Sequence, residues 1–287
     1  MSFVTIKNKE LTVVINTLGA QIDSIKDNAT GREYMWEADP EIWEDKAPVL
    51  FPIVGRLENG KYVFEGKEYE MGMHGFAQNM EFAIENLSET SVCFVINSNE
   101  ETKKVYPFDF EFRVIFTLDG RKLSTDFVTK NLSNRDMYYS VGSHEGFAIS
   151  GGVENYSIVL DEVETLSKYE VLPSGVIGEM PVLCFDNTNT LKLSEEYFKV
   201  DALIFFDMKS KGMALRDDRS GEKIHVSFPD ADTVLVWKEP NASFVCIEPW
   251  SGTPDLAWKR VDDFSKKYRI RALKYKESEK ISHEITF

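Results

Sequence analysis

The strongest constraint on the fold is an alternation of apolar and polar residues, with period two, between residues 108 and 129. In its first half the apolar positions are Phe108, Phe110, Phe112, Val114, Phe116 and Leu118. Asp119-Gly120 follows, a pair typical of a tight hairpin turn, and the alternation resumes at Leu123. Because successive side chains of a strand point to opposite faces of a sheet, the pattern predicts two half-buried antiparallel strands.

Similar short apolar runs, separated by turn residues, recur along the chain. Turn signals lie at residues 27–31, 59–60 and 217–221, next to strand-like sequence. Helical patterning is weak, and only residues 39–46 and 262–268 could form short amphipathic helices. The sequence therefore predicts an all-β protein, a sandwich or barrel of antiparallel strands with few short helices.

Length and composition favour one domain. The 287 residues are 43% hydrophobic, which is enough for a large core. No linker rich in Pro, Gly or Ser, no low-complexity tract and no repeat of fixed period divides the sequence. We expect a single domain over residues 1–287.

Net charge restricts the partners. The formal net charge is -15 at pH 7, so nucleic acid or an anionic membrane surface would be repelled. The first ten residues lack the basic and apolar segments of a signal peptide, and no apolar run is long enough to span a bilayer. We expect a cytoplasmic protein that binds neither nucleic acid nor membranes, and the sequence leaves homodimer formation open.

Three cysteines, Cys93, Cys184 and Cys246, are widely spaced and flanked by apolar residues. A disulfide framework or a zinc site would need closer Cys/His spacing. We predict three reduced core cysteines and no metal site.

An acid/base pair is the first chemical feature of the sequence. Glu248 follows the apolar run Val-Cys-Ile, and Pro249 is predicted to end that strand, so that Glu248 faces a cleft. His74 lies in Met-His-Gly-Phe and His144 in Gly-Ser-His-Glu-Gly-Phe. Carboxylate and imidazole together transfer protons near neutral pH without a metal or an organic cofactor.

The other histidines and one arginine have simpler interpretations. His225 and His283 lie in alternating strand patterns on the polar side, and we assign both to structure. Arg56 follows a wholly apolar run, and its planar fork of donors suits neighbouring sugar hydroxyls. From the residues alone, a surface ion pair with Glu58 explains Arg56 equally well. A loop histidine such as His74 is also more often structural than functional.

Six motifs, in order and at similar spacing, resemble the aldose 1-epimerase or galactose mutarotase-like family over nearly the whole chain. They are Leu-Phe-Pro-Ile-Val-Gly-Arg56, Met-His74-Gly-Phe, Tyr-Pro-Phe-Asp-Phe-Glu-Phe, Tyr-Tyr-Ser-Val-Gly-Ser-His144, Asp201-Ala-Leu-Ile-Phe and Ile-Glu248-Pro-Trp-Ser-Gly-Thr-Pro-Asp. The set looks closest to the shorter bacterial branch called LacX-like.

The resemblance implies a large antiparallel β-sandwich with a carbohydrate cleft, and a reaction that interconverts the α and β anomers of a free aldose such as galactose or glucose. It implies that Glu248 is the general base, that His144 is the general acid, and that Arg56, His74 and Asp201 hold the sugar. No cofactor is implied. Asp201 is selected by the resemblance alone.

Two departures from the family pattern lie beside the site motifs. Glu145 follows His144 where many relatives have proline, and it could raise the proton affinity of the imidazole, alter the substrate or point to solvent. Gly55 precedes Arg56 where the family has asparagine, which removes one hydroxyl contact. Among nearby aromatic residues Trp237 and Trp250, ahead of Phe76, are predicted to stack on a sugar.

Three other functions compete with the mutarotase. A hexose-6-phosphate 1-epimerase would need a cluster of basic residues for the phosphate, and only Arg56 lies beside the site motifs. A non-catalytic sugar-binding protein would not need both Glu248 and His144. A glycoside hydrolase would use two carboxylates, for which Glu145 and Glu248 are the candidates.

Overall fold

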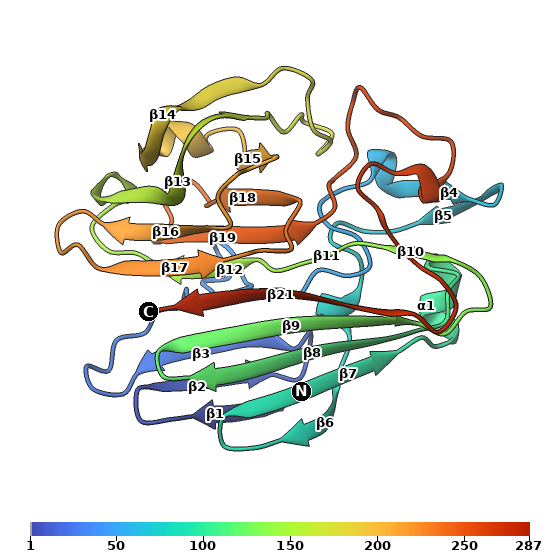
Figure 1. The fold of residues 1–287 in the computed structure, drawn as a ribbon, viewed down its shortest axis with the longest axis horizontal. Helices are drawn as coiled ribbons and strands as arrows, with labels where there is room; N and C mark the ends of the chain where they lie inside the picture. The colour runs from blue at the N-terminus through green and yellow to red at the C-terminus, as the bar shows by residue number, and fades with distance from the viewer. Residues whose placement is uncertain (1) are drawn as a thin grey trace.

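The computed structural model describes residues 2–287 and is built almost entirely of antiparallel strands (Figure 1). The largest sheet has nine strands, in the order β14 (Val182–Lys192), β13 (Tyr156–Lys168), β16 (Gly212–Asp217), β17 (Lys223–Ser227), β21 (Ser278–Thr286), β9 (Lys122–Asn131), β8 (Phe110–Asp119), β7 (Ser91–Asn97) and β6 (Ala83–Leu87). The predicted all-β fold is confirmed.

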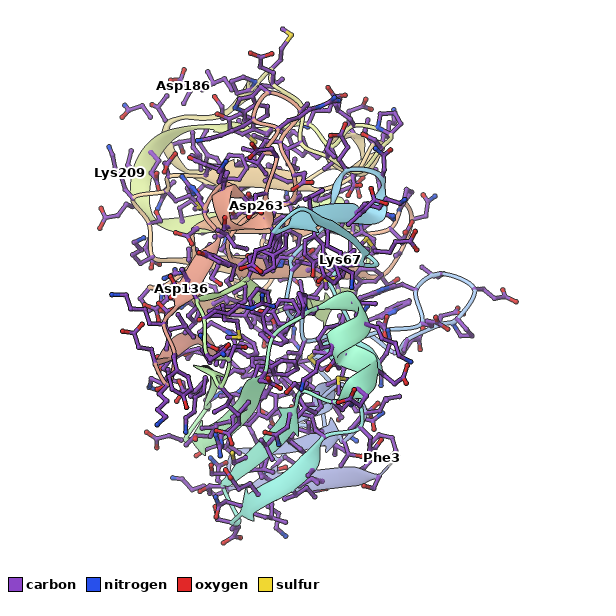
Figure 2. The ribbon with its side chains drawn as sticks, turned by 90° about the vertical axis from the view of Figure 1, so that its right-hand side faces the viewer. Phe3, Lys67, Asp136, Asp186, Lys209 and Asp263 are labelled. Carbon is purple, nitrogen blue, oxygen red and sulfur yellow. The ribbon has the colours of Figure 1, made fainter. Side chains whose placement is uncertain are left out.

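Smaller sheets complete the fold. A five-stranded sheet contains β11 (Val141–Gly142), β12 (Glu145–Ala148), β19 (Phe244–Ser251), β18 (Thr233–Trp237) and β15 (Leu203–Phe206). A three-stranded sheet contains β1 (Phe3–Lys7), β2 (Leu11–Asn16) and β3 (Gln21–Asp27). There are also two two-stranded sheets, the hairpin of β4 (Lys61–Phe64) with β5 (Lys67–Glu70) and the pair of β10 (Met137–Tyr139) with β20 (Arg271–Leu273), which are distant in the sequence. Figure 2 places Asp186 of β14 and Phe3 of β1 near opposite ends of the molecule.

The hairpin of β8 and β9 follows the predicted alternation. Phe110 to Leu118 are buried at every second position, and Gly120 has the positive φ that its turn requires. One apolar cluster joins these side chains to Val13 of β2 and Ile247 of β19. The main core therefore lies between the nine-stranded sheet and the smaller sheets, as in a sandwich.

Helices are few, as predicted, but not where predicted. Residues 39–46 form turns, and only a 3-10 turn, η5 (Phe264–Lys266), lies within 262–268. The one α-helix of residues 2–287 is α1 (Glu100–Val105), which Asn99 and Thr102 begin with a reciprocal capping box. The remaining 3-10 turns are η1 (Glu58–Gly60), η2 (Ala77–Asn79), η3 (Val153–Asn155) and η4 (Glu195–Phe198). Within residues 2–287, no helix combines the length and the apolar character that a bilayer crossing requires.

His283 and Cys184 differ from their predicted environments, whereas His225, Cys93 and Cys246 do not. His283 of β21 was expected on the polar side, but it is 2% exposed and faces the core. His225 of β17 does lie on the polar side, where its Nε2 is 2.8 Å from Oδ1 of Asp161. The three cysteines are free, and Cys93 and Cys246 are buried, whereas Cys184 is only half-buried.

The strand that carries Glu248 does not end at Pro249. β19 continues to Ser251, all of its residues are buried, and Pro249 lies opposite Val234 of β18. Proline is tolerated because β11 and β12, on the other side of β19, are separated at Ser143 and His144. The carbonyl of Pro249 accepts a hydrogen bond from Ser143, so its nitrogen faces this break, where no ladder donor is needed.

Candidate active site

All seven predicted site residues line one cavity of about 340 Å³, a size typical of small-molecule sites. These are Arg56, His74, His144, Asp201, Trp237, Glu248 and Trp250. β18 and β19 form its floor, and the segments 43–56, 73–78, 171–177 and 201–204, together with His144 and Pro254, form its walls. Residues far apart in the sequence therefore meet in one place.

Glu248 occupies the floor in an unusual state. The side chain is 1% exposed and neither carboxylate oxygen has a hydrogen-bond partner in the described part of the chain. Burial, and then the charges of Asp201 and Glu145, raise the pKa of Glu248 well above its usual value. Burial of a carboxylate without hydrogen bonds costs free energy of folding. The group can therefore readily take up a proton, or accept a hydrogen bond from a hydroxyl group of a ligand.

His144 lies beside Glu248 in the break between β11 and β12. Its Nε2 is 3.3 Å from Oε2 of Glu248, and its Nδ1 is buried without a partner. Burial lowers the pKa of His144 to about 4, although the charge of Glu145 acts in the opposite direction. The two groups are close enough to share one proton, so they titrate as a pair.

Aromatic rings hold the imidazole of His144 on three sides. Its ring centroid lies 5.1 Å from that of Trp43, 5.3 Å from that of Trp237 and 5.5 Å from that of His74. Trp43 was not selected from the sequence, because it belongs to a segment interpreted as a short helix. The segment instead turns back through a hydrogen bond from the Trp43 N–H to the Asp39 carbonyl.

Trp250 supports His144 through the backbone. Its indole Nε1 donates to the carbonyl of Ser143 at 3.1 Å, and its ring packs against Gly142. A Cβ on Gly142 would come within 2.4 Å of that ring, so glycine is required there. Phe76, the other aromatic residue considered, does not line the cavity and packs against Phe51 in the core.

His74 is held as a neutral imidazole. The N–H of Gly55 donates to its Nδ1 at 3.1 Å, which leaves the proton on Nε2 and makes that atom a donor. Burial, followed by the charges of His144 and Arg56, lowers the pKa of His74 well below its usual value. The loop is tight because Gly75 has a positive φ, and a Cβ there would meet the Phe51 carbonyl at 2.3 Å.

Arg56 and Asp201 complete the rim. Asp201 precedes β15, and its Oδ1 accepts from the Ala202 N–H at 2.7 Å, while burial raises the pKa of its carboxyl group. The stem of Arg56 passes under Gly175, where a Cβ would come within 2.0 Å of Arg56 Cδ. Arg56 faces the cavity and has no ion pair with Glu58, which instead pairs with Arg260 at 2.5 Å.

The departures from the family pattern have structural explanations. At Gly55 a Cβ would lie 2.5 Å from the ring of Pro254, so a larger residue cannot be placed there without moving that proline. Glu145 does not line the cavity. It points to the opposite face of the sheet from His144 and pairs with His283.

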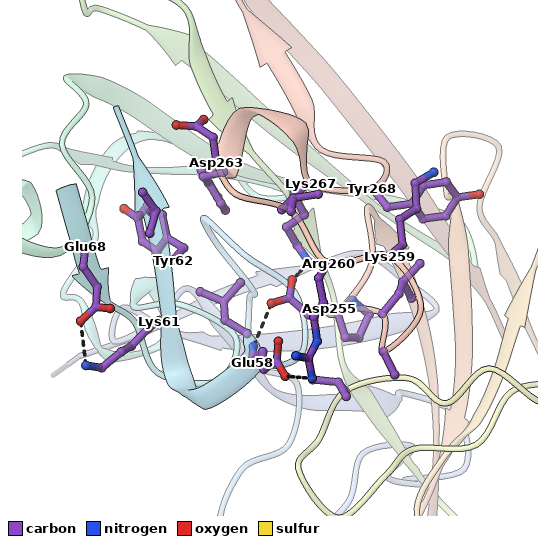
Figure 3. A pocket seen from close by; sticks show the side chains of 18 residues that line it. Glu58, Lys61, Tyr62, Glu68, Asp255, Lys259, Arg260, Asp263, Lys267 and Tyr268 are labelled. Atoms are coloured by element: carbon purple, nitrogen blue, oxygen red, sulfur yellow. Dashed lines mark hydrogen bonds and ion pairs between the residues drawn. The ribbon is translucent and has the colours of Figure 1, made fainter. Parts of the chain in front are cut away.

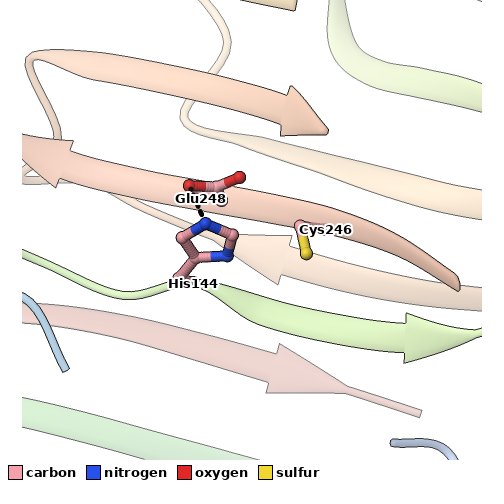
Figure 4. Close-up of side chains that lie close together, drawn as sticks. All are labelled: His144, Cys246 and Glu248. Atoms are coloured by element: carbon pink, nitrogen blue, oxygen red, sulfur yellow. Dashed lines mark ion pairs between the residues drawn. The ribbon is translucent and has the colours of Figure 1, made fainter. Parts of the chain in front are cut away.

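His144, Cys246 and Glu248 lie near one another (Figure 4), with one potential ligand atom from each within 4.8 Å of the others. The Cys246 thiol is fully buried beside Trp36 and Phe244, and burial raises its pKa well above the usual value. Metal ligation requires the thiolate. We therefore interpret Cys246 as a packing residue.

A second hollow, of about 160 Å³, shares Pro254 with the cavity but contains none of the predicted site residues (Figure 3). Three pairs account for most of its charged side chains: Lys267 with Asp255 at 2.5 Å, Lys61 with Glu68 at 2.7 Å and Arg260 with Glu58 at 2.5 Å. Glu248 and His144, whose buried polar atoms lack hydrogen-bond partners among the described residues, line the larger cavity, which is therefore the candidate active site.

Comparisons with known proteins match most of the chain. Residues 2–265 match the family model described as aldose 1-epimerase. The plasmid-encoded protein LacX of Lactococcus lactis subsp. lactis is 37% identical over 262 residues, 87% of each chain. A galactose mutarotase related enzyme from Lactobacillus acidophilus is 36% identical, with a TM-score of 0.94 over 99% of this chain and 97% of that one.

More distant structures share the fold. A galactose mutarotase-like protein from Lactobacillus casei has 23% identity and a TM-score of 0.93 over 99% of both chains. A galactose 1-epimerase from Lactobacillus acidophilus has 12% identity and a TM-score of 0.72, over 99% of this chain and 93% of that one. The predicted sandwich of this fold family is confirmed.

Proposed function

The chain belongs to the aldose 1-epimerase family, and from this premise we propose that it interconverts the α and β anomers of a neutral, free aldohexose such as galactose or glucose. The observation that carries the proposal is the buried carboxylate of Glu248, without hydrogen-bond partners among the described residues and 3.3 Å from the imidazole of His144, in a cavity that Arg56 and Trp237 also line.

The proposed reaction needs one base and one acid. Ionised Glu248 takes the proton of the anomeric hydroxyl, while protonated His144 gives a proton to the ring oxygen, so that the ring opens to the aldehyde. Rotation about the bond between C1 and C2 presents the other carbonyl face, and reclosure reverses both proton transfers. General acid and base catalysis contribute about 10²- to 10⁴-fold each, and positioning supplies the rest.

The remaining residues are suited to hold the sugar ring. His74 offers an Nε2–H donor, Asp201 offers an acceptor, and Arg56 offers a planar set of donors. Trp237, which is half-buried at the cavity wall, can pack on the apolar face of the ring. Donors and acceptors in this arrangement match a polyol.

Charge supports an unphosphorylated substrate. Arg56 is the one lysine or arginine among the lining residues, whereas four carboxylates line the same cavity: Asp45, Asp201, Glu239 and Glu248. A phosphate would enter a region of negative charge with one cationic partner. A hexose-6-phosphate 1-epimerase is therefore the weaker alternative.

Glycoside hydrolysis through Glu145 and Glu248 does not fit the geometry. Glu145 is 2% exposed, lies behind the sheet and does not reach the cavity, so it cannot flank a scissile bond. A non-catalytic sugar-binding protein has no need for a destabilising buried carboxylate, which favours catalysis over binding alone.

Polarimetry on freshly dissolved α-galactose and α-glucose tests the proposal. We expect the protein to accelerate equilibration of at least one of the two sugars. Galactose 6-phosphate and glucose 6-phosphate serve as comparison substrates. Acceleration confined to the phosphates would replace the proposal by the phosphate-specific enzyme, and tight sugar binding without acceleration would replace it by a binding protein.

Gly175→Ala is expected to weaken substrate binding. The new Cβ would displace the stem of Arg56, and alanine is also strained at the positive φ of this position. We expect KM for the preferred sugar to rise about five- to tenfold with a smaller change in kcat. Gly66→Ala is the matched control, because Gly66 has a similar φ and nothing within 4 Å of its Cβ position. Equal effects of the two substitutions would contradict the role given to Arg56.

A further inference from the structure

Glu145 and His283 form a polar pair inside the sandwich, directly behind the candidate active site. His144 and Glu145 are consecutive, so their side chains point to opposite faces of the five-stranded sheet. His144 faces the cavity, and Oε1 of Glu145 lies 2.8 Å from Nε2 of His283 on β21 of the nine-stranded sheet. The pair thus connects β12, which begins directly after the proposed acid, to the opposite sheet.

This pair is shielded from solvent, with the hydroxyl group of Ser143 as a polar neighbour of Glu145. Both side chains are 3% exposed, and the ring of Phe127 lies 5.7 Å from that of His283. The chain contains a second pair of a histidine and a carboxylate with the same 2.8 Å separation, His225 and Asp161, but those side chains are 36% and 43% exposed. One pair is screened by water and the other is not.

The surroundings of Glu145 favour the ionised form of its carboxyl group. Burial opposes its ionisation, but the charge of His283 and its hydrogen bond outweigh burial and hold the pKa below its usual value. An anion therefore lies in a medium of low dielectric close to the acid and the base. The pKa of Glu248 is raised mainly by burial, then by the charge of Asp201, and then by the charge of Glu145. The charge of Glu145 also acts to raise the pKa of His144.

We propose that Glu145, held by His283, is a positioning residue that sets the proton affinity of the His144–Glu248 pair from the far face of the sheet. The inference rests on the proposed function, since it assigns Glu145 a part in the same proton transfers. The burial that makes Glu248 a strong base also makes His144 hard to protonate. A fixed anion behind His144 counteracts the second effect without occupying any of the space needed by the sugar.

Other ionisable groups surround His144 and Glu145, and the experiment does not replace them. On the cavity side these are Arg56, His74, Asp201 and Glu248, with the buried thiol of Cys246 beside them, and on the core side His283. Replacing Glu145 changes one charge and leaves these side chains unaltered.

The first test is an NMR titration of the four histidines, labelled with ¹³C at Cε1, in the wild type and in Glu145→Gln. The His144 signal is identified by its loss in His144→Gln. Glutamine keeps the size of the side chain and can still hydrogen-bond His283. We expect the titration midpoint of His144 to move to lower pH by about half a unit or more. Asp161→Asn, the exposed counterpart, should leave it unchanged.

The second test is the pH profile of kcat/KM for mutarotation. Loss of the anion lowers the proton affinity of both members of the pair, so both limbs should move to lower pH in Glu145→Gln. His283→Gln provides an independent variant if Glu145→Gln folds poorly. Without the imidazole, Glu145 takes up a proton more readily, and the His144 titration should move in the same direction.

The outcomes separate the two proposals. If Glu145→Gln only lowers Tm and leaves both the His144 titration and the pH profile in place, the pair merely joins the sheets and the inference is overturned. If the wild type shows no mutarotation while the His144 titration still shifts, the electrostatic coupling stands and the proposed function falls.

Discussion

Glu248→Gln is expected to lower kcat for mutarotation by at least about 10³-fold while the affinity for the sugar stays within about tenfold. The substitution keeps the shape of the side chain and removes the base. Because neither oxygen of Glu248 has a hydrogen-bond partner among the described residues, the amide breaks no existing hydrogen bond and removes only the contact of the carboxylate with His144 at 3.3 Å. Polarimetry gives kcat, and calorimetric titration of the sugar gives the affinity. A variant with near wild-type turnover would show that another group is the base.

The same substitution should stabilise the protein at neutral pH. Burial raises the pKa of Glu248 above its value of about 4.5 in the unfolded chain. Its contribution to stability is fully present below that value and declines as pH rises through the raised pKa, because the unfolded state ionises first. Glutamine never ionises, so we expect Tm at pH 7 to rise by about 2 °C or more.

Glu164→Gln is the matched control for this gain in stability. Glu164 is also buried, but its two oxygens accept from the N–H groups of Lys209 and Ser210 at 2.9 and 2.8 Å. Burial raises its pKa, but the hydrogen bonds from Ser210 and Lys209 outweigh burial, so that its pKa lies below the usual value. Its stabilising effect is present above the unfolded pKa and lost as pH falls through the folded one. Glutamine there should lower Tm at pH 7. A fall in Tm for both variants would contradict the view that Glu248 is a destabilising group.

His144→Gln should reduce kcat by about 10²- to 10⁴-fold, because no other cavity residue is placed beside Glu248 to donate a proton to the ring oxygen. The loss of the acid should also remove the basic limb of the pH profile and keep the acidic limb, where Glu248 takes up its proton. Both are measured by polarimetry across pH 4 to 9.

His225→Gln is the control for a histidine substitution in general. His225 contacts Asp161 on the polar face of β17, away from the cavity. Its replacement should leave kcat within about twofold. A comparable loss of activity in both variants would mean that the histidines have been assigned wrongly.

Local patterns were sufficient to predict many of the strands and to select Glu248 with His74 and His144, whereas the roles of Glu248 as base and His144 as acid came from the family resemblance and stay a prediction. The alternation around Phe112 depends only on neighbours in the sequence, and the structure follows it residue by residue. Glu248 was placed in a cleft for a reason that proved wrong, since β19 continues through Pro249. The break between β11 and β12 that tolerates this proline is formed by another part of the chain, which one strand alone does not reveal.

Contacts between distant segments could not be predicted in this way. Trp43 approaches His144 because a turn, and not a helix, follows Asp39. The pairing of Glu145 with His283 joins positions 138 residues apart, so neither residue signals the other. In the sequence, the one sign of this pairing was Glu145, a glutamate where many relatives have proline. The core-facing position of His283 on β21 became visible only in the structure.

β19 lies between β18 on one side and β11 and β12 on the other, and every one of its residues is buried. Glu248 therefore belongs to a buried central strand. Arg56, His74 and Asp201, by contrast, lie in segments that connect the strands. Substitutions in those segments can accumulate without disturbing the strand. Within such an architecture, the residues proposed to hold the sugar can change in the course of evolution while the proposed base keeps its place.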